Sequence, residues 1–136
     1  MSYIHITVKA VIIFDNKILL LKRTRPSSDG LGVYELPGGG LDEGESFDEA
    51  IQREVFEETG LAVDILEPAY TFRHIRTGYC GLGLGFLCLA QSGSVSISFE
   101  HEDFLFASLA QAEKLLNKEI FSDVKNAYDK YIRNYE

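Results

Sequence analysis

The sequence is poor in cysteine and has no long apolar run, and both deficits exclude classes of protein. Its 136 residues include two cysteines, Cys80 and Cys88, and neither lies in a CxxC pair, so the sequence suggests no zinc site. No apolar run approaches the ~18 residues that a membrane-spanning helix needs. The N-terminus lacks a basic stretch followed by an apolar segment, which is the pattern of a secretory signal. We therefore expect a cytoplasmic protein that does not enter a membrane.

Positive charge is also scarce. The chain holds 13 Lys and Arg residues against 21 Asp and Glu residues, which gives a formal net charge of −8. An acidic surface repels polyanions, so we expect no binding to nucleic acids. A substrate that carries phosphate would need positive charge supplied locally, and a divalent cation is the simplest source.

The length and the composition indicate one ordinary globular domain. A chain of 136 residues falls within the usual size range of a single domain, so we expect one domain over residues 1–136. Hydrophobic residues make up 46% and charged residues 25% of the chain, which argues against disorder. We find no internal repeat and no low-complexity segment.

Apolar alternation and short apolar runs predict a protein rich in strands. Turn-forming residues are concentrated between residues 24 and 44, around one apolar stretch at 33–36, and a loop region of this length usually has a functional role. The predicted strands cover residues 4–14, 18–21, 63–76, 82–90 and 95–99.

Three serines are placed as helix N-caps. Ser46 precedes a segment up to Thr59 that contains no Gly or Pro, and Gly60 follows as a stop signal. Ser108 and Ser122 open two further predicted helices, and the tyrosines at helical spacing in the last one are interpreted as packing residues. Elements in this order predict an α/β fold, an α/β/α sandwich in which a mixed β-sheet is flanked by helices on both faces.

The predicted helix after Ser46 places carboxylates on its own apolar face. At about 100° per residue, Ala50, Ile51 and Val55 form an apolar stripe. Glu54 and Glu58 fall inside this stripe and Glu57 falls at its edge. Burial of unpaired like charges is costly, and a hard cation such as Mg²⁺, which prefers oxygen ligands, would compensate it. From periodicity alone, an acidic surface helix with a different apolar face remains an alternative.

The same segment carries a longer pattern of fixed residues. Gly39, Glu45 and the run Arg53-Glu54-Val55-Phe56-Glu57-Glu58-Thr59-Gly60-Leu61 match every fixed position of G-x₅-E-x₇-R-E-U-x-E-E-x-G-U, in which U is apolar. This segment, residues 39–61, resembles the Nudix box of the Nudix hydrolase family. The preceding Glu-Leu-Pro-Gly-Gly at 35–39 is also similar to the family, although Tyr34 stands where many members have Trp.

The resemblance implies an activity and a set of metal ligands. Nudix hydrolases cleave a nucleoside diphosphate linked to another moiety at its pyrophosphate, with Mg²⁺ or Mn²⁺. By analogy, Glu54, Glu57 and Glu58 hold the metal, and Gly38 offers its carbonyl oxygen as a further ligand. Arg53 is expected to pair with Glu45 or Glu57 and so to fix the loop-helix-loop segment, whose structural glycines are Gly39 and Gly60.

Acidic residues after the predicted strand 95–99 resemble the acidic stretch that precedes the second helix in relatives. We expect Glu100 to be an additional metal ligand or the general base, with Glu102 as second choice, and a solvated acidic loop is the alternative. If Phe99 faces the core, strict alternation turns Glu100 away from it, so the chain must bend at His101 for Glu100 to reach the metal.

Basic residues occur in two groups, at residues 22–25 and 73–76. In so acidic a protein they are candidates for binding the non-bridging phosphate oxygens, and Arg23 is ranked first, ahead of Arg25 and Arg73. No functional role is predicted for His5, His74 or His101 as individual residues.

The substrate is read by residues outside the box. The short chain favours a small nucleotide such as a nucleoside triphosphate, and ADP-ribose, nucleotide sugars and dinucleoside polyphosphates are the alternatives. A nucleotide-sensing domain that binds without cleaving, or a protein-interaction scaffold, is a non-enzymatic alternative. The sequence is compatible with a monomer or a homodimer.

Overall fold

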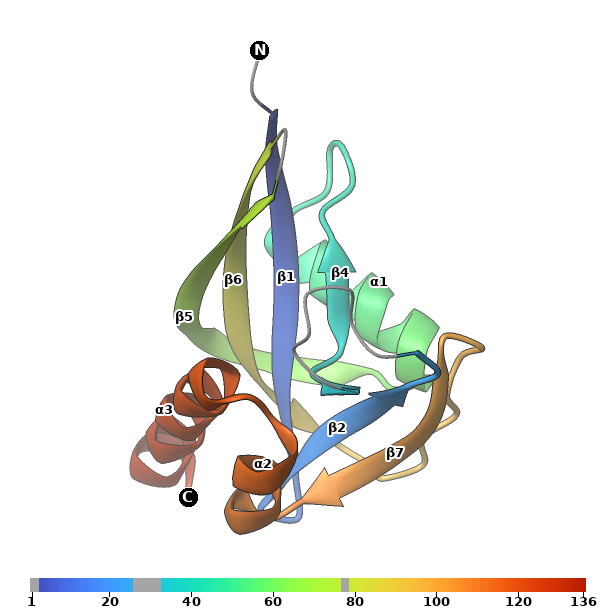
Figure 1. Ribbon diagram of the computed structural model, residues 1–136. Coiled ribbons are helices and arrows are strands. Elements are labelled where there is room, and N and C mark those ends of the chain that lie inside the picture. The colour runs from blue at the N-terminus through green and yellow to red at the C-terminus, as the bar shows by residue number, and fades with distance from the viewer. Residues whose placement is uncertain (1–2, 26–32, 77–78) are drawn as a thin grey trace.

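The computed structural model describes residues 3–25, 33–76 and 79–136 of the chain, and Figure 1 shows their arrangement. In chain order the elements are β1 (Tyr3–Phe14), β2 (Lys17–Arg23), β3 (Tyr34–Glu35), β4 (Gly38–Gly40), α1 (Phe47–Thr59), β5 (Val63–Arg76), β6 (Tyr79–Ala90), β7 (His101–Ala107), α2 (Leu109–Leu115) and α3 (Lys118–Tyr135). No helix of the described part is long and apolar enough to cross a membrane.

The strands form one mixed sheet. Its main order is β3-β2-β1-β6-β5, while β4 pairs with β1 and β7 pairs with β2. The pairing of β1 with β6 is parallel and runs from Tyr3 opposite Tyr79 to Ile13 opposite Leu89. The other pairings are antiparallel.

The strand β1 changes its partner along its length. Its early part pairs with β4, with Thr7 opposite Gly40, and its end pairs with β2, with Ile13 opposite Ile18. The sheet therefore divides between β2 and β4, and residues 34–40 cross this division. The amide of Ala10 donates to the carbonyl of Pro37 at 2.9 Å, which fixes the crossing segment to β1.

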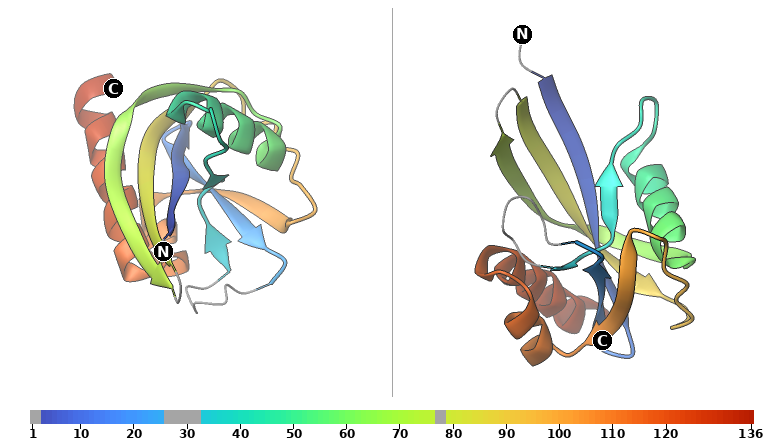
Figure 2. Two further views of the ribbon diagram at one scale, coloured as in Figure 1. Left: turned by 90° about the horizontal axis from the view of Figure 1, so that it is seen from above. Right: turned by 45° about the vertical axis from the view of Figure 1, so that its right-hand side comes forward.

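Helices cover both faces of the sheet, as the predicted α/β/α sandwich requires. The helix α1 buries Ala50, Ile51 and Val55 against one face. On the other face α2 and α3 bury Ala112, Val124 and Ala127 against another apolar cluster. Figure 2 shows α1 and α3 on opposite sides of the curved sheet.

Local signals in the sequence position several elements correctly. The hairpin between β1 and β2 turns at Asp15 and Asn16, whose φ angles of 52° and 58° suit a tight hairpin turn. Ser46 and Ser108 cap α1 and α2, each in a reciprocal capping box with the side chain three residues further on. Of the predicted packing tyrosines of α3, Tyr128 and Tyr131 lie against the second cluster, whereas Tyr135 is exposed.

The predicted strand over residues 95–99 is wrong, because this segment is irregular in the structure. Ser96 and Ser98 donate their amides to the carbonyls of Thr59 and Glu58, at 2.8 and 3.3 Å. The segment therefore satisfies free carbonyls at the end of α1 instead of pairing in the sheet. The alternation of apolar and polar residues in this segment reflects packing, because Val95 and Ile97 lie against the core under α1.

Two further expectations need correction. Phe99 is 92% exposed and does not face the core, because the chain turns at residues 99–100 and the strand β7 begins only at His101. The last helix begins at Lys118, before Ser122. Its N-cap is Asn117, whose Oδ1 accepts from the amide of Ile120 at 2.8 Å.

Candidate active site

The helix α1 carries its carboxylates in the phase that the sequence predicts. It begins after Ser46 and ends at Gly60, which has a φ of 73°. Glu58 is only 8% exposed and lies among the buried residues of the apolar stripe, whereas Glu57 is exposed to solvent. The alternative of an acidic helix that keeps all its carboxylates on the solvent side does not hold for Glu58.

Glu54 lies against the backbone of β4. A Cβ atom added at Gly39 would stand 2.6 Å from the Cδ and Oε1 atoms of Glu54, closer than side chains approach one another. Glycine at position 39 therefore lets this carboxylate lie directly on the strand. The side chain of Glu54 is 15% exposed as a result.

Arg53 connects the helix to the loop before it. Its Nε donates to Glu45 Oε2 at 2.6 Å, its Nη1 to Glu54 Oε1 at 2.9 Å, and its Nη2 to the carbonyl of Gly40 at 2.9 Å. A longer contact of 3.5 Å joins it to Glu57. Of the two alternative partners predicted for Arg53, Glu45 and Glu57, the structure contains both. This pairing raises the pKa of Arg53 and, with help from the Asp42 amide, lowers that of Glu45.

Glu58 is held at the division of the sheet. Its Oε1 accepts from the amide of Gly38 at 2.7 Å. A side chain at position 38 would collide with the carbonyl of Val8, and the φ of 150° there also favours glycine. Burial raises the pKa of Glu58 to about 7, although the Gly38 amide and the charge of Lys9 oppose this shift. A cation beside this carboxylate would favour its ionised form.

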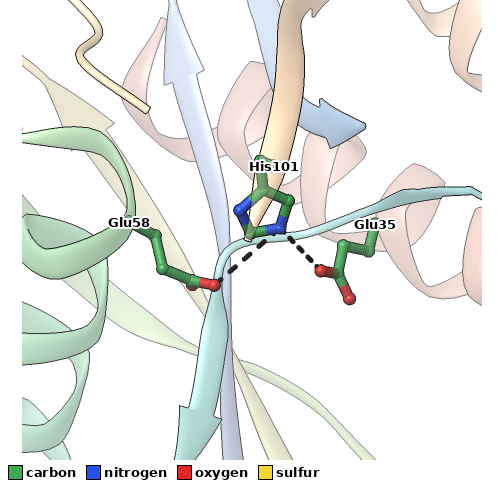
Figure 3. Close-up of side chains that lie close together, drawn as sticks. All are labelled: Glu35, Glu58 and His101. Atoms are coloured by element: carbon green, nitrogen blue, oxygen red, sulfur yellow. Dashed lines mark hydrogen bonds and ion pairs between the residues drawn. The ribbon is translucent and has the colours of Figure 1, made fainter. Parts of the chain in front are cut away.

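Two residues that the sequence reasoning did not assign complete the cluster. His101 on β7 is 4% exposed, and its Nε2 lies 2.8 Å from Glu35 Oε2 and 3.9 Å from Glu58 Oε2. Figure 3 shows the imidazole between the two carboxylates. Burial raises the pKa of Glu35, but the His101 hydrogen bond and the charges of Lys9 and Arg23 outweigh this and lower it overall.

A pocket of ≈570 Å³ opens beside this cluster. It is lined by Arg23, Thr24, Arg25, Glu35, Gly38, Glu58, Phe99 and Glu100. The turn at residues 99–100 is anchored here, because the amide of Thr24 donates to the carbonyl of Glu100 at 3.3 Å. The structure therefore brings the predicted residues Arg23, Arg25 and Glu100 to the same pocket as Glu58.

Other predicted residues are not gathered at this pocket. Arg73 is exposed on β5 and does not belong to the described lining, and the side chains of His74 and Arg76 lie outside the described part of the chain. Glu102 forms an ion pair with Lys22 at 3.2 Å. Among the described residues, the acidic and histidine side chains that converge within 4.8 Å of one another are Glu35, Glu58 and His101.

The donor set fits a hard divalent cation. Glu54, Glu57 and Glu58 lie on successive turns of α1, and of these three Glu58 belongs to the described lining of the pocket, together with Glu100. Carboxylate and carbonyl oxygens are the ligands that Mg²⁺ prefers. Fold and site together define a class of protein, an α/β protein in which Glu58 of an acidic helix lines a pocket with Arg23 and Arg25, which suits a metal-assisted reaction of phosphates.

The family is shown by the sequence as a whole. The profile of the NUDIX domain matches residues 4–125, and the chain belongs to the Nudix family. An ADP-ribose pyrophosphatase from Methanocaldococcus jannaschii is 46% identical over 61 residues, which cover 43% of this chain and 35% of that protein. An NAD-capped RNA hydrolase NudC from Actinobacillus succinogenes is 49% identical over 49 residues, which cover 35% of this chain and 19% of that protein. The chain thus spans about a third or less of the length of these relatives.

Solved structures resemble the whole chain. A MutT protein from Methanosarcina mazei Go1 superimposes with a TM-score of 0.80 at 26% identity, over 99% of this chain and 98% of that one. An ADP-ribose pyrophosphatase from Streptococcus suis gives 0.74 at 25% identity, over 97% and 94%. An Ap4A hydrolase from C. elegans gives 0.79 at 21% identity, over 96% and 99%, and supports the fold alone.

Proposed function

We propose that this chain is a metal-dependent pyrophosphohydrolase that cleaves a nucleoside diphosphate linked to another moiety. The observation that carries the proposal is the position of Glu58, a box carboxylate that lines one pocket together with Arg23 and Glu100. Metal-binding carboxylates and phosphate-binding arginines are the two parts that hydrolysis of a pyrophosphate requires. The names of the relatives, an ADP-ribose pyrophosphatase and an NAD-capped RNA hydrolase, support the same reaction class.

The metal of this proposal is Mg²⁺, with Mn²⁺ as a substitute. Glu54, Glu57 and Glu58 would hold it, with the carbonyl of Gly38 and the carboxylate of Glu100 as further oxygen ligands. When bound there, the ion would polarise the pyrophosphate and lower the pKa of a bound water.

The remaining groups bind the substrate and move the proton. Arg23 and Arg25 face the pocket and can donate to non-bridging phosphate oxygens, for which a guanidinium is well suited. Glu100, at the turn, would serve either as that further metal ligand or as the base that accepts the proton of the attacking water. Arg53 contacts the carboxylates of Glu54 and Glu57 and so holds them in place. The assignment of Arg73 to phosphate binding stays a prediction without support from this pocket.

A small nucleotide is the proposed substrate. A nucleoside triphosphate is the substrate that the sequence favours, and the pocket of ≈570 Å³ with its two arginines is compatible with it. The name of the archaeal relative makes ADP-ribose the strongest alternative, ahead of nucleotide sugars and dinucleoside polyphosphates. Mass analysis of the products distinguishes these substrates, because each leaves a different pair of phosphate-containing fragments.

The test is hydrolysis of a nucleotide panel with Mg²⁺, with Mn²⁺ and with excess EDTA. We expect turnover with either cation and none in EDTA. Replacing Glu57 by Gln removes a proposed ligand without changing its size, and should lower kcat by about two orders of magnitude. The matched control is Glu43→Gln, at an exposed position in the loop before α1. Binding of nucleotides without turnover of any would favour the nucleotide-sensing alternative instead.

A further inference from the structure

His101 occupies the most buried position of the site and has no role in the reaction described so far. It is the first residue of β7 and lies between Glu35 on β3 and Glu58 on α1. Its Nε2 atom makes both contacts, and the shorter one, at 2.8 Å, is to Glu35. Figure 3 shows that these three side chains come from separate segments of the chain.

The surroundings of Nδ1, the other ring nitrogen of His101, indicate that Nε2 carries a proton. Within the described part of the chain, Nδ1 is buried and has no hydrogen-bond partner. A metal on Nε2 would require the proton on Nδ1, where a buried donor would stay unpaired at a high cost. A proton on Nε2 instead leaves Nδ1 as an acceptor only. The contacts therefore favour an imidazole that donates Nε2–H to a carboxylate over a metal ligand.

The carboxylate of Glu35 contacts two cationic side chains in addition to His101. Its Oε2 faces His101, and its Oε1 forms ion pairs with Lys9 at 3.7 Å and with Arg23 at 3.5 Å. Lys9 is also fixed by its hydrogen bond to the carbonyl of Leu36 at 3.2 Å. Arg23 is 40% exposed at its side chain and lines the pocket, so its guanidinium can reach a ligand while Glu35 orients it.

We propose that His101 is a positioning residue for phosphate binding, which donates its Nε2–H to Glu35 and through Glu35 orients Arg23 toward the phosphate oxygens of the substrate. This rests on the proposed function, because it gives Arg23 a phosphate to bind. It assigns a role to a buried histidine that makes no contact with the substrate itself. It also separates Glu35 from the metal ligands, since its carboxylate is committed to His101, Lys9 and Arg23.

Two substitutions at one position test the proposal. The amide nitrogen of Gln can occupy the place of Nε2, so His101→Gln keeps the donor, whereas His101→Leu has a similar size and no donor. We expect His101→Leu to raise KM about tenfold, as for the loss of a hydrogen bond to a charged group. His101→Gln should stay within about threefold of the unchanged protein, and kcat should change little in either variant.

A second measurement separates positioning from metal binding. Mn²⁺ affinity, followed by electron paramagnetic resonance, should be the same in both variants and in the unchanged protein. A loss of Mn²⁺ affinity in both variants would make His101 a metal ligand and overturn the proposal. An equal rise of KM in both would overturn it as well, because the ring would then serve only as packing.

A failure of the positioning role can be distinguished from a failure of the proposed function. The Kd of a nucleotide analogue with a methylene-bridged diphosphate, measured by calorimetry, needs no turnover and should rise in His101→Leu alone. If the unchanged protein hydrolyses nothing but this difference in Kd appears, the proposed reaction fails and the positioning role stands. If His101→Leu does not fold, Glu35→Gln decides, since it keeps the shape and removes the charge that holds Arg23. An unaltered Kd in Glu35→Gln would refute the proposal.

Discussion

Glu100 and Glu102 are two positions apart in an acidic segment, but only one of them faces the pocket. Glu100 lies in the turn beside Glu58, while Glu102 forms an ion pair with Lys22 on β2. We therefore expect Glu100→Gln to lower kcat by about tenfold or more with little change in KM, as for a group that acts in the transition state. Glu102→Gln should leave kcat almost unchanged. Steady-state kinetics of the two variants side by side checks this, and similar small effects would exclude Glu100 as base or ligand.

The ionised carboxylate of Glu45 makes the stability of the folded protein depend on pH. Its pKa is lowered because Arg53 and the amide of Asp42 hydrogen-bond to its charged form. The stabilisation is present above the ordinary pKa of 4.5 and is lost as the pH falls through the lower value of the folded protein. Melting curves of the unchanged protein and of Glu45→Gln should differ in Tm at pH 7, and the difference should shrink as the pH falls below about 4.5. A constant difference down to low pH would contradict this.

Contacts between site residues that are close in the sequence could be predicted, and contacts between residues far apart in the sequence could not. The pairing of Arg53 with Glu45 follows from a pattern within one segment, and the structure contains it. Glu35 and His101 meet only because β3 and β7 both pair with β2. Nothing in the neighbourhood of His101 in the sequence indicates a partner so far along the chain, so no role was predicted for it.

At the scale of elements, β4 is a strand of three glycines, and the space beside its middle residue, Gly39, is too small for a side chain. Gly39→Ala would push the carboxylate of Glu54 off the strand, because the added carbon would come within 2.6 Å of it. We expect kcat to fall by about tenfold or more, with the fold retained, as for a misplaced metal ligand. Gly40→Ala is the matched control, since the nearest atom to its added carbon belongs to the exposed side chain of His5, at 3.1 Å instead of 2.6 Å. Circular dichroism and kinetics of both variants measure the difference.

The segment before β7 shows where element prediction fails. The alternation of Val95 and Ile97 reports burial correctly, but burial does not identify the partner. Here the partner is the end of α1, whose free carbonyls accept from Ser96 and Ser98. The caps of α1 and α2, the hairpin and the long strands were predictable because their causes are local, whereas this contact depends on two elements that only the fold brings together.

The whole molecule carries a net charge of −8, and part of this charge is concentrated at the site. Mg²⁺ should therefore stabilise the folded chain, because it binds the assembled carboxylates and not the unfolded chain. At a concentration 100 times Kd the gain is about 2.7 kcal/mol, which raises Tm by several degrees. Calorimetry with MgCl₂ and with NaCl of equal ionic strength measures it, and Glu54→Gln should reduce the effect. An equal rise with both salts would mean general charge screening instead of a site.

Because β1 pairs with different strands along its length, its pairing can be completed only late in the synthesis of the chain. The helix with the whole box is complete once residue 60 has been synthesised, but β1 is then still without its parallel partner β6, and β2 is without β7. His101 begins the last strand to be added, and Glu100 lies in the turn just before it. The residues of the acidic helix are therefore synthesised well before those that complete the pocket, so the pocket cannot form until synthesis has passed β7.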